Sequence, residues 1–424
     1  MSSLITQLIV DLSWECDKHL INSTVEELTE LTVLAVKEVL GDILRVLYAP
    51  HKVFKDVIKN PGYLGPVILL IIFVLAQVGS SYIVASRSYI EQTNPLGDVG
   101  DSWTANALNW EATPGVVISN NTVDFINSTL YYGATSIEFM ASDLQSISMG
   151  LPDFGDSVNC GPEGFNNVSL KVKIISPDSN PESVYLVLSS LDESSFVYDI
   201  TNEFKNNNDV WTNLTLPVGF GDWTNIGNTA VWENITGLNL EFSWSGNSTV
   251  NMLVDGLFFR GDFRGPLELY GVSYFSSSAI NAVAPFLFEW LLLSGFMYLL
   301  IKGLKSESEV VWRTLMVAVG YSLVTIVIQA LLLTLVYTSL PDIYYPLEVL
   351  AGTTGEFQVA YQVILDKIAF VSNVGSIIQV GVYVWIVALG TFITNTITDL
   401  GWLKSLLVSG VSLLLTVIVL GFLL

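Results

Sequence analysis

The chain has 424 residues, of which 51% are hydrophobic and 13% are charged, and its formal net charge is −23. Soluble domains carry about 25% charged residues, so this composition indicates a membrane protein. The strong negative charge excludes nucleic acid as a partner, because the two would repel. With 2 cysteines and 2 histidines, the chain has neither a disulfide framework nor the spacing of a His- or Cys-based metal site.

Two amphipathic helices are predicted within residues 1–63, before the first apolar run. Ser23-Thr24-Val25-Glu26 has the pattern of a capping box that opens a helix reaching to about residue 47. In the second helix Val53, Phe54 and Val57 share one face and lysines occupy the other. This pattern is typical of a helix that lies among lipid headgroups. The pair either anchors the N-terminus or forms a docking surface for a cytoplasmic partner.

Five runs are long and apolar enough to cross a bilayer, which needs about 20 such residues. They are residues 64–86, 280–301, 310–336, 368–393 and 406–424. Lys and Arg cluster before the first run and in the loop between the second and third. The bias of these residues toward the cytoplasm predicts a cytoplasmic N-terminus in a cell membrane, with residues 87–279 and the C-terminus outside.

The entry to the first span carries a family resemblance. "RVLYAPHKVFKDVIKNPGYLGPVILLIIFVLAQV" resembles the corresponding segment of the Yip-domain family of membrane proteins. "LLLSGFMYLLIKGL" followed by "WRTLMVAVGYSLV" is similar to that family's central pair of spans. The resemblance covers about residues 1–87 and 276–424, and it implies a five-helix bundle of prokaryotic, archaeal type without enzymatic chemistry. The family usually has a short loop where this chain has a large insertion.

That insertion is acidic and rich in predicted strands. Residues 88–275 hold 23 Asp and Glu against 5 Lys and Arg. "VSLKVKII" and "GLNLEFSW" alternate apolar and polar residues, and polar connections separate further short strands. We predict an all-β sandwich over residues 118–262, flanked by stalks at 87–117 and 263–279. The fold class is therefore a multi-domain protein, with a five-helix transmembrane bundle (64–86 and 280–424) and a jelly-roll sandwich between its first and second spans.

The order of strands in the insertion resembles carbohydrate-binding modules and galactose-binding-like domains. The segments that carry the likeness are "NVSLKVKII", "DVWTNLTLPV", "AVWENITGLNLEF" and "VNMLVDGLFFRG". The resemblance implies a structural calcium held by Asp255 of the closing strand, with Asp124 or Glu138 as its partner. The alternative is that Asp255-Gly256 makes a turn or a bulge.

Aromatic side chains in this block are candidates for stacking on sugar rings. Trp223 lies in a Gly-rich stretch and is the best exposed candidate; the others are Trp211, Trp232, Tyr185 and Tyr198. A tryptophan in a β-sandwich is more often part of the core. No pair of carboxylates stands out as a glycosidase site. Six Asn-X-Ser/Thr triplets are candidates for glycosylation, at Asn120, Asn127, Asn167, Asn213, Asn234 and Asn247.

Glu289 lies near the middle of the second span, and an acid within the membrane indicates function by default. Its expected partners are polar residues of other spans, namely Gln77, Gln329, Asn373, Ser376 and Gln379. One interpretation is a proton- or cation-binding position in a transporter or channel. The other is a protonated Glu that holds the helices together.

The function that these patterns favour is that of a non-enzymatic membrane glycoprotein at the cell surface. Its expected partners are the lipid bilayer and, outside the cell, a glycan or an envelope protein; the bundle is also open to forming a homo-oligomer. Two alternatives are a transporter or channel that uses Glu289, and a membrane-organising or trafficking scaffold with cytoplasmic partners at the N-terminus.

Overall fold

The fold is that of a computed structural model, which describes residues 36–97, 100–191, 193–205, 207–227, 229–304 and 310–423. The chain divides into two compact units. The helical unit is formed by Met1–Val84, Gly271–Leu340 and Phe370–Leu424, and the β unit by Ala85–Tyr270 and Pro341–Ala369. The capping box at residues 23–26 lies outside the described residues.

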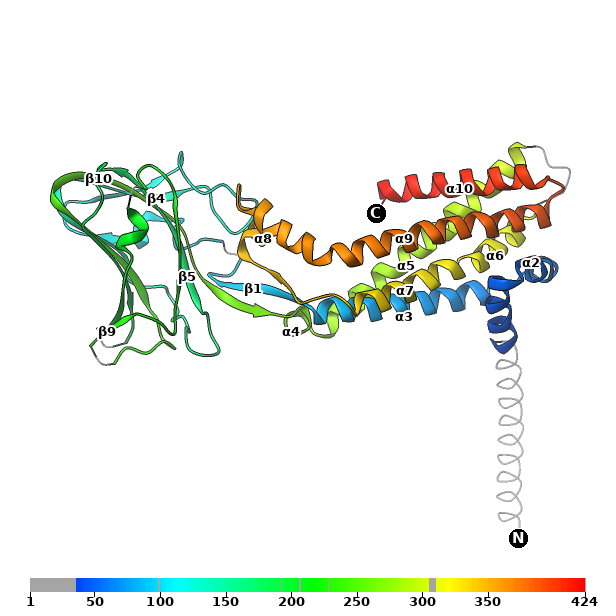
Figure 1. The fold of residues 1–424 in the computed structure, drawn as a ribbon, viewed down its shortest axis with the longest axis horizontal. Helices are drawn as coiled ribbons and strands as arrows, with labels where there is room; N and C mark the ends of the chain where they lie inside the picture. Colours follow the sequence, from blue (N-terminus) through cyan, green and yellow to red (C-terminus); the bar gives the residue numbers. More distant parts are fainter. Residues whose placement is uncertain are drawn as a thin grey trace, which may run out of the picture. The chain divides into compact units, whose positions relative to one another are not determined.

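The helical unit confirms the five predicted apolar helices (Figure 1). They are α3 (Leu64–Ser86), α5 (Val272–Gly303), α6 (Trp312–Ser322) followed by α7 (Val324–Tyr337), α9 (Phe357–Ile397) and α10 (Trp402–Leu423). Each is long and apolar enough to cross a membrane. The predicted third span is divided at Leu323, where ψ is −2°. Both α6 and α7 contribute side chains to the apolar core of the helical unit.

The second amphipathic helix is present as α2 (Pro50–Lys59), and residues 36–48 before it are also helical. Val53, Phe54 and Val57 of α2 are buried in the core of the helical unit. Its lysines, by contrast, are exposed. The apolar face of α2 therefore contacts protein, and its basic face is left for solvent or headgroups.

The β unit contains eleven strands among the described residues. Their bounds are β1 (Ser88–Asn94), β2 (Glu111–Ala112), β3 (Val117–Asn121), β4 (Ser136–Leu151), β5 (Asn167–Ser176), β6 (Ser183–Ser189), β7 (Ser195–Asp199), β8 (Thr212–Pro217), β9 (Thr224–Ile226), β10 (Gly237–Arg264) and β11 (Ile343–Tyr345). Short helices α4 (Pro266–Tyr270) and α8 (Leu347–Ala351) complete it.

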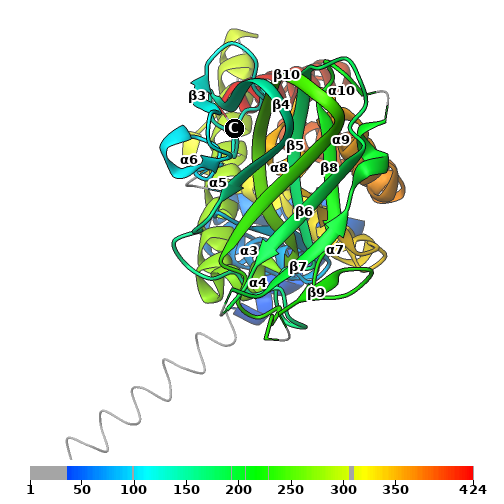
Figure 2. The ribbon, with the colours of Figure 1, turned by 90° about the vertical axis from the view of Figure 1, so that its left-hand side faces the viewer.

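Two long strands, β4 and β10, take part in both layers of the β unit. Layer A consists of β2, the second half of β4, the first half of β10, β6, β7 and β9 (Figure 2). Layer B consists of β3, the first half of β4, the second half of β10, β5 and β8. At the edge of layer B, β1 pairs with the end of β10, and β11 pairs with β1.

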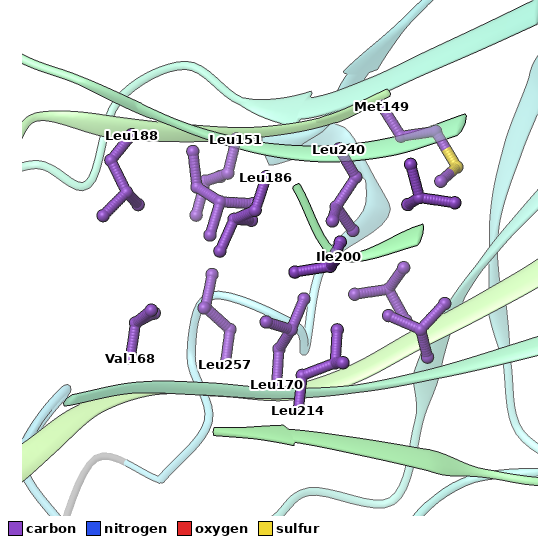
Figure 3. Close-up of a cluster of buried hydrophobic side chains, with 14 of the residues drawn as sticks. Met149, Leu151, Val168, Leu170, Leu186, Leu188, Ile200, Leu214, Leu240 and Leu257 are labelled. Atoms are coloured by element: carbon purple, nitrogen blue, oxygen red, sulfur yellow. The ribbon is translucent and has the colours of Figure 1, made fainter. Parts of the chain in front are cut away.

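The core lies between the layers, as the alternation in the sequence predicts. Leu186, Leu188 and Leu240 of layer A face Leu170 and Leu214 of layer B, and all five are buried (Figure 3). Because successive side chains of a strand point to opposite faces, the residues between them must point outward. This alternation decides which side chains each layer offers to the outside.

The β unit differs from the predicted domain in its extent. The predicted stalk at residues 87–117 is instead part of it, because β1 pairs with β10 and both Trp103 and Trp110 are buried in the core. The stalk predicted over 263–279 is replaced by the end of β10, α4 and the start of α5. In addition, Pro341–Ala369, the connection between the third and fourth spans, belongs to the β unit.

Candidate functional site

The outer face of layer A carries a polar groove. Its volume is about 380 Å³, and it is lined by Glu111 and Thr113 near β2, Ser148 and Gly150 of β4, and Ser189 and Asn239 from the next strands. The buried neighbours of Ser148 (Ile147 and Met149) and of Asn239 (Leu238 and Leu240) point inward, so the two polar side chains point outward. The groove is thus a direct result of the strand alternation.

Hydrogen bonds link the polar groups of the groove into a row. The Ser148 hydroxyl donates to Asn239 Oδ1 at 2.8 Å, and Asn239 Nδ2 donates to Glu241 Oε1 at 3.0 Å. The backbone N–H of Ser148 donates to the Thr113 hydroxyl at 2.9 Å. Hydroxyl, amide and carboxylate groups therefore lie side by side, and each keeps lone pairs or hydrogens for a ligand.

Tyr185 adds an aromatic ring to the same face. It lies on β6 opposite Glu241 of β10 and opposite Asp199 of β7, and it is 36% exposed. Ser189 of the groove is four residues further along the same strand, and so points to the same side. Tyr185 is the one predicted sugar-stacking residue on the outer face of layer A.

The other predicted stacking residues at this end of layer A form a cluster with the core. The Trp232 ring stacks on Phe196 with centroids 3.7 Å apart, and Trp223 lies edge-on to Trp232 at 5.5 Å. Tyr198 contacts Trp223, whose Nε1 donates to the carbonyl of Pro217 at 2.7 Å. These three side chains are half-buried and pack against the core. Their rings are therefore largely occupied by protein.

Trp211 points instead to the outer side of layer B, which other parts of the chain cover. Its Nε1 donates to Asp124 Oδ1 at 3.0 Å, and Lys173 Nζ donates to Asp124 Oδ2 at 2.8 Å. This bond to Asp124 raises the pKa of Lys173. Lys171 pairs with Glu356 at 2.5 Å. Residues 124–130 and the 341–369 segment thus lie over lysines of β5.

Arg260 of β10 joins the 341–369 segment to the sheet. It donates two hydrogen bonds to Glu91 of β1, both at 2.8 Å, and two to Glu348 of α8, at 2.7 and 3.0 Å. Burial alone would lower the pKa of Arg260, but the bonds to Glu348 and Glu91 together raise it. The N–H of Leu347 also donates to Glu91. In this network, the "Arg260 network" below, Arg260 and Glu91 are buried and Glu348 is half-buried.

Asp255 lies in a bulge of β10 and contacts a different acid from those predicted. Its two oxygens accept hydrogen bonds from the N–H groups of Ile126 and Gly256, each at 2.7 Å, and its carboxyl is hydrogen-bonded to that of Asp101. Gly256 has a φ of +59°, which favours glycine. Burial raises the pKa of Asp255 to about 8 and also raises that of Asp101. Because two buried carboxylates repel each other, a proton shared between the two carboxyls favours this arrangement.

The residues around Asp255 do not fit a calcium ion. Calcium takes six to eight oxygen ligands, whereas the side chains here supply two carboxylates and the hydroxyl of Thr104. Asp124 is paired with Lys173, and Glu138 accepts hydrogen bonds from Asn121 and Asn251. In the part of the chain that the structure describes, no three His, Cys, Asp or Glu side chains are grouped closely enough for a metal.

The glycosylation candidates differ in accessibility. Asn120, Asn127, Asn213 and Asn247 are exposed, while Asn167 and Asn234 are half-buried. The side chain of Asn120 bonds to the backbone of Ala105 and Ala107, and that of Asn247 bonds to Asp143. None of the six lines the groove.

In the helical unit, Glu289 and three of its five predicted partners line one cavity, whereas Asn373 and Ser376 do not line it. Gln329 and Gln379 border the cavity together with Glu289, as does Gln77. Asn373 is exposed on α9. Polar residues inside apolar spans were the sequence signal for this cluster.

Comparison with known proteins gives likeness to solved structures only: no family model and no curated protein matches the chain. A family 11 carbohydrate-binding module from Clostridium thermocellum, in complex with a β-1,3-1,4-mixed-linked tetrasaccharide, is 13% identical; the match covers 40% of this chain and 94% of the module, with a TM-score of 0.27. A family 30 module of a cellulosomal cellulase from the same organism is 12% identical over 37% of this chain and 87% of its own length, also at 0.27. An exo-β-agarase is 8% identical, with 37% and 23% covered and a TM-score of 0.27. Likenesses at this TM-score carry no argument about the ligand of this chain.

Proposed function

We propose that this chain is a non-enzymatic membrane protein whose β unit binds a neutral glycan on the outer face of layer A. The observation that carries the proposal is the groove of Ser148, Asn239 and Glu111 with Tyr185 on the same face. Sugar hydroxyls are both donors and acceptors, so a row of hydroxyl, amide and carboxylate groups matches them. An exposed tyrosine ring offers a flat apolar face for the CH groups of a pyranose.

The charge of the groove narrows the class of glycan. The lining residues include one carboxylate, that of Glu111, and no Lys or Arg. Glu241, next to Asn239, adds a second carboxylate. An acidic or sulfated sugar would be repelled by these carboxylates without any compensating cation. Neutral sugars are therefore the best match.

The composition of the β unit supports the proposed membrane topology. Segments 85–270 and 341–369 form one compact unit, although two apolar spans, α5 and α6–α7, separate them in the chain. Both segments must then lie on the same side of a membrane. An even number of crossings between the segments returns the chain to the same side. The two crossings α5 and α6–α7 meet this requirement, and they also agree with the distribution of Lys and Arg. We place this side outside the cell, with the N-terminus in the cytoplasm, in a bundle of the Yip-domain type.

The test uses the full chain in lipid nanodiscs, since the β unit is assembled from two separate segments. We expect binding to neutral oligosaccharides on a glycan array, and a Tyr185→Ala variant should weaken it about tenfold, which corresponds to about 1.4 kcal/mol. Tyr185→Phe keeps the ring and should retain most of the affinity. Binding of acidic glycans alone, or unchanged binding by Tyr185→Ala, would contradict the proposal.

A further inference from the structure

The cavity around Glu289 is open on one side and is polar, although apolar helices line it. Its volume is about 340 Å³. Five helices contribute to its wall: Gln77 of α3, Glu289 of α5, Gln329 of α7, Gln379 and Tyr383 of α9, and Val417 of α10. Three glutamines around a single carboxylate are not needed to fill space between helices, because leucine would do so at lower cost in a bilayer.

Most of these polar groups are not used by the fold. Gln379 Nε2 donates to the Tyr383 hydroxyl at 2.7 Å. Within the described residues, the side chains of Glu289, Gln77 and Gln329 take part in no hydrogen bond or ion pair, and the cavity wall holds no Lys, Arg or His. These three side chains are half-buried by the protein. In the hydrocarbon core of a bilayer a polar group without a partner costs free energy, and a carboxylate costs most. Their combined presence indicates that something else completes the site.

A second cavity adjoins the first. It measures about 350 Å³, shares Phe73 and Gln77 with the first, and is lined further by Ser81, Ser278 and Asn281. These residues lie near the end of α3 and the beginning of α5, which are the ends attached to the β unit in the chain. Polar groups therefore continue from that end of the helical unit to Gln77 and on to Glu289.

Pro285 adds a backbone ligand to this route. It lies inside α5 and lines the second cavity. Proline has no N–H, so the carbonyl of Asn281, four residues earlier, loses its helical hydrogen bond. Irregular backbone at membrane depth is tolerated where it lines a polar cavity. A carbonyl oxygen freed in this way is a ready ligand for a cation.

We propose that the Glu289 cavity binds an alkali-metal cation, which reaches it along the second cavity from the Asn281 end. The available ligands are carboxylate, amide, hydroxyl and carbonyl oxygens, which suit hard cations. A single carboxylate without another charge favours a monovalent ion, because the site is then neutral in the bilayer. The space exceeds that of a bare ion, so the ion would keep part of its water. Protons compete with the cation, since protonation of Glu289 removes the charge that attracts it.

The binding test measures the thermal unfolding midpoint of the full chain in nanodiscs, with NaCl or KCl replacing N-methyl-D-glucamine chloride at constant ionic strength. We expect a saturable rise of the midpoint with Na⁺ or K⁺, and an apparent affinity that falls as the pH is lowered. Glu289→Gln should weaken the apparent affinity at least about tenfold, because the neutral amide no longer offsets the charge of the ion. The matched control is Asn373→Ala, a polar residue of α9 outside the cavity.

Several results would overturn the proposal. They are a midpoint that responds to pH but not to the alkali cation, an equal response to N-methyl-D-glucamine, or an unchanged cation response in Glu289→Gln. If Glu289→Gln does not fold, Gln329→Leu serves instead and should also weaken cation binding. The route has its own test by stopped-flow: a change in tryptophan fluorescence on mixing with Na⁺ or K⁺ reports binding, and Ser278→Leu in the second cavity should slow association. An unchanged association rate would refute the route.

Discussion

The two outer faces of the β unit differ in whether other parts of the chain cover them. The outer side of layer B is covered by residues 124–130 and by the 341–369 segment, and charged pairs such as Lys171–Glu356 hold the cover in place. Within the described residues no segment is paired with the outer face of layer A in this way, and its central groups, Ser148 and Asn239, are hydrogen-bonded to each other and to the Glu241 carboxylate. Ion pairs thus mark the face that the protein closes with its own chain, and hydrogen-bonded hydroxyl, amide and carboxylate groups mark the face that we propose for the ligand.

The largest effect is expected from breaking the Arg260 network, which belongs to the covered side. Arg260→Met leaves Glu91, whose side chain is 2% exposed, as a buried carboxylate without its cation. Removing one partner of a buried pair costs about 3–5 kcal/mol. In a domain of this size we expect a fall in the unfolding midpoint on the order of 10 °C, measured in nanodiscs.

The matched control is Arg264→Ala, since Arg264 pairs with Asp262 but is 45% exposed. An exposed pair contributes about 0–1 kcal/mol, so this variant should unfold close to the wild type. Equal destabilisation by the two variants would show that the Arg260 network does not hold the cover.

The second effect concerns pH and the Asp101–Asp255 pair. The pKa of Asp255 is raised in the folded protein to about 8 from 3.8, so the folded state binds the proton more tightly than the unfolded state. This contribution to stability is complete below pH 4, declines as the pH rises, and is lost above about pH 8. We expect the unfolding midpoint of the wild type to fall across that window.

Asp101→Asn should flatten that pH dependence. The new amide can donate to the Asp255 carboxylate in place of the shared proton, while its oxygen still accepts from the Gly133 N–H. Each unit of pKa shift removed corresponds to about 1.4 kcal/mol, so the variant should exceed the wild type in stability at pH 9. If the unfolding midpoint of Asp101→Asn fell with pH as steeply as that of the wild type, a group other than this pair would be responsible for the pH dependence.

The sequence predicted those parts of the molecule whose signals are local. The apolar signal of each span lies within the span itself, and the alternation of apolar and polar residues that predicts β5 and β10 lies within those strands. That the 341–369 segment belongs to the β unit could not be predicted in this way, because β11 is three residues long and its partner β1 lies about 250 residues earlier in the chain. The partners of Arg260 are likewise 169 and 88 residues away.

The candidate site shows the same limit. The sequence identified Tyr185 as one of five aromatic candidates, but ranked Trp223 above it because Trp223 lies among glycines. In the structure that Gly-rich loop returns to the sandwich, and Trp223 packs beside Trp232. Which side of a loop faces the core depends on contacts far away in the chain. The groove residues Ser148 and Asn239 gave no signal, since isolated polar residues on strands are common.

The third effect separates the two faces by their aromatic residues. Tyr185→Ala on layer A should lose glycan binding with little change in stability, because the side chain is exposed and its ring contacts no other. Trp211→Ala on the covered side should do the reverse, since it removes the hydrogen bond to Asp124 and packing beneath the cover. We expect a loss of about 2 kcal/mol in stability at unchanged affinity. If Trp211→Ala also abolished binding, the ligand face would be assigned incorrectly.

The smallest effect tests where the 341–369 segment is held. Arg87 pairs with Asp342 at 3.1 Å, but both side chains are more than 40% exposed. The backbone bond from the Ile343 N–H to the Arg87 carbonyl, at 2.7 Å, does not depend on the side chain. Arg87→Ala should therefore lower the free energy of unfolding by less than about 1 kcal/mol, and less still in high salt. If Arg87→Ala lowered the free energy of unfolding as much as Arg260→Met, the Arg260 network would contribute no more than this surface pair. The 341–369 segment would then be held mainly at its exposed beginning.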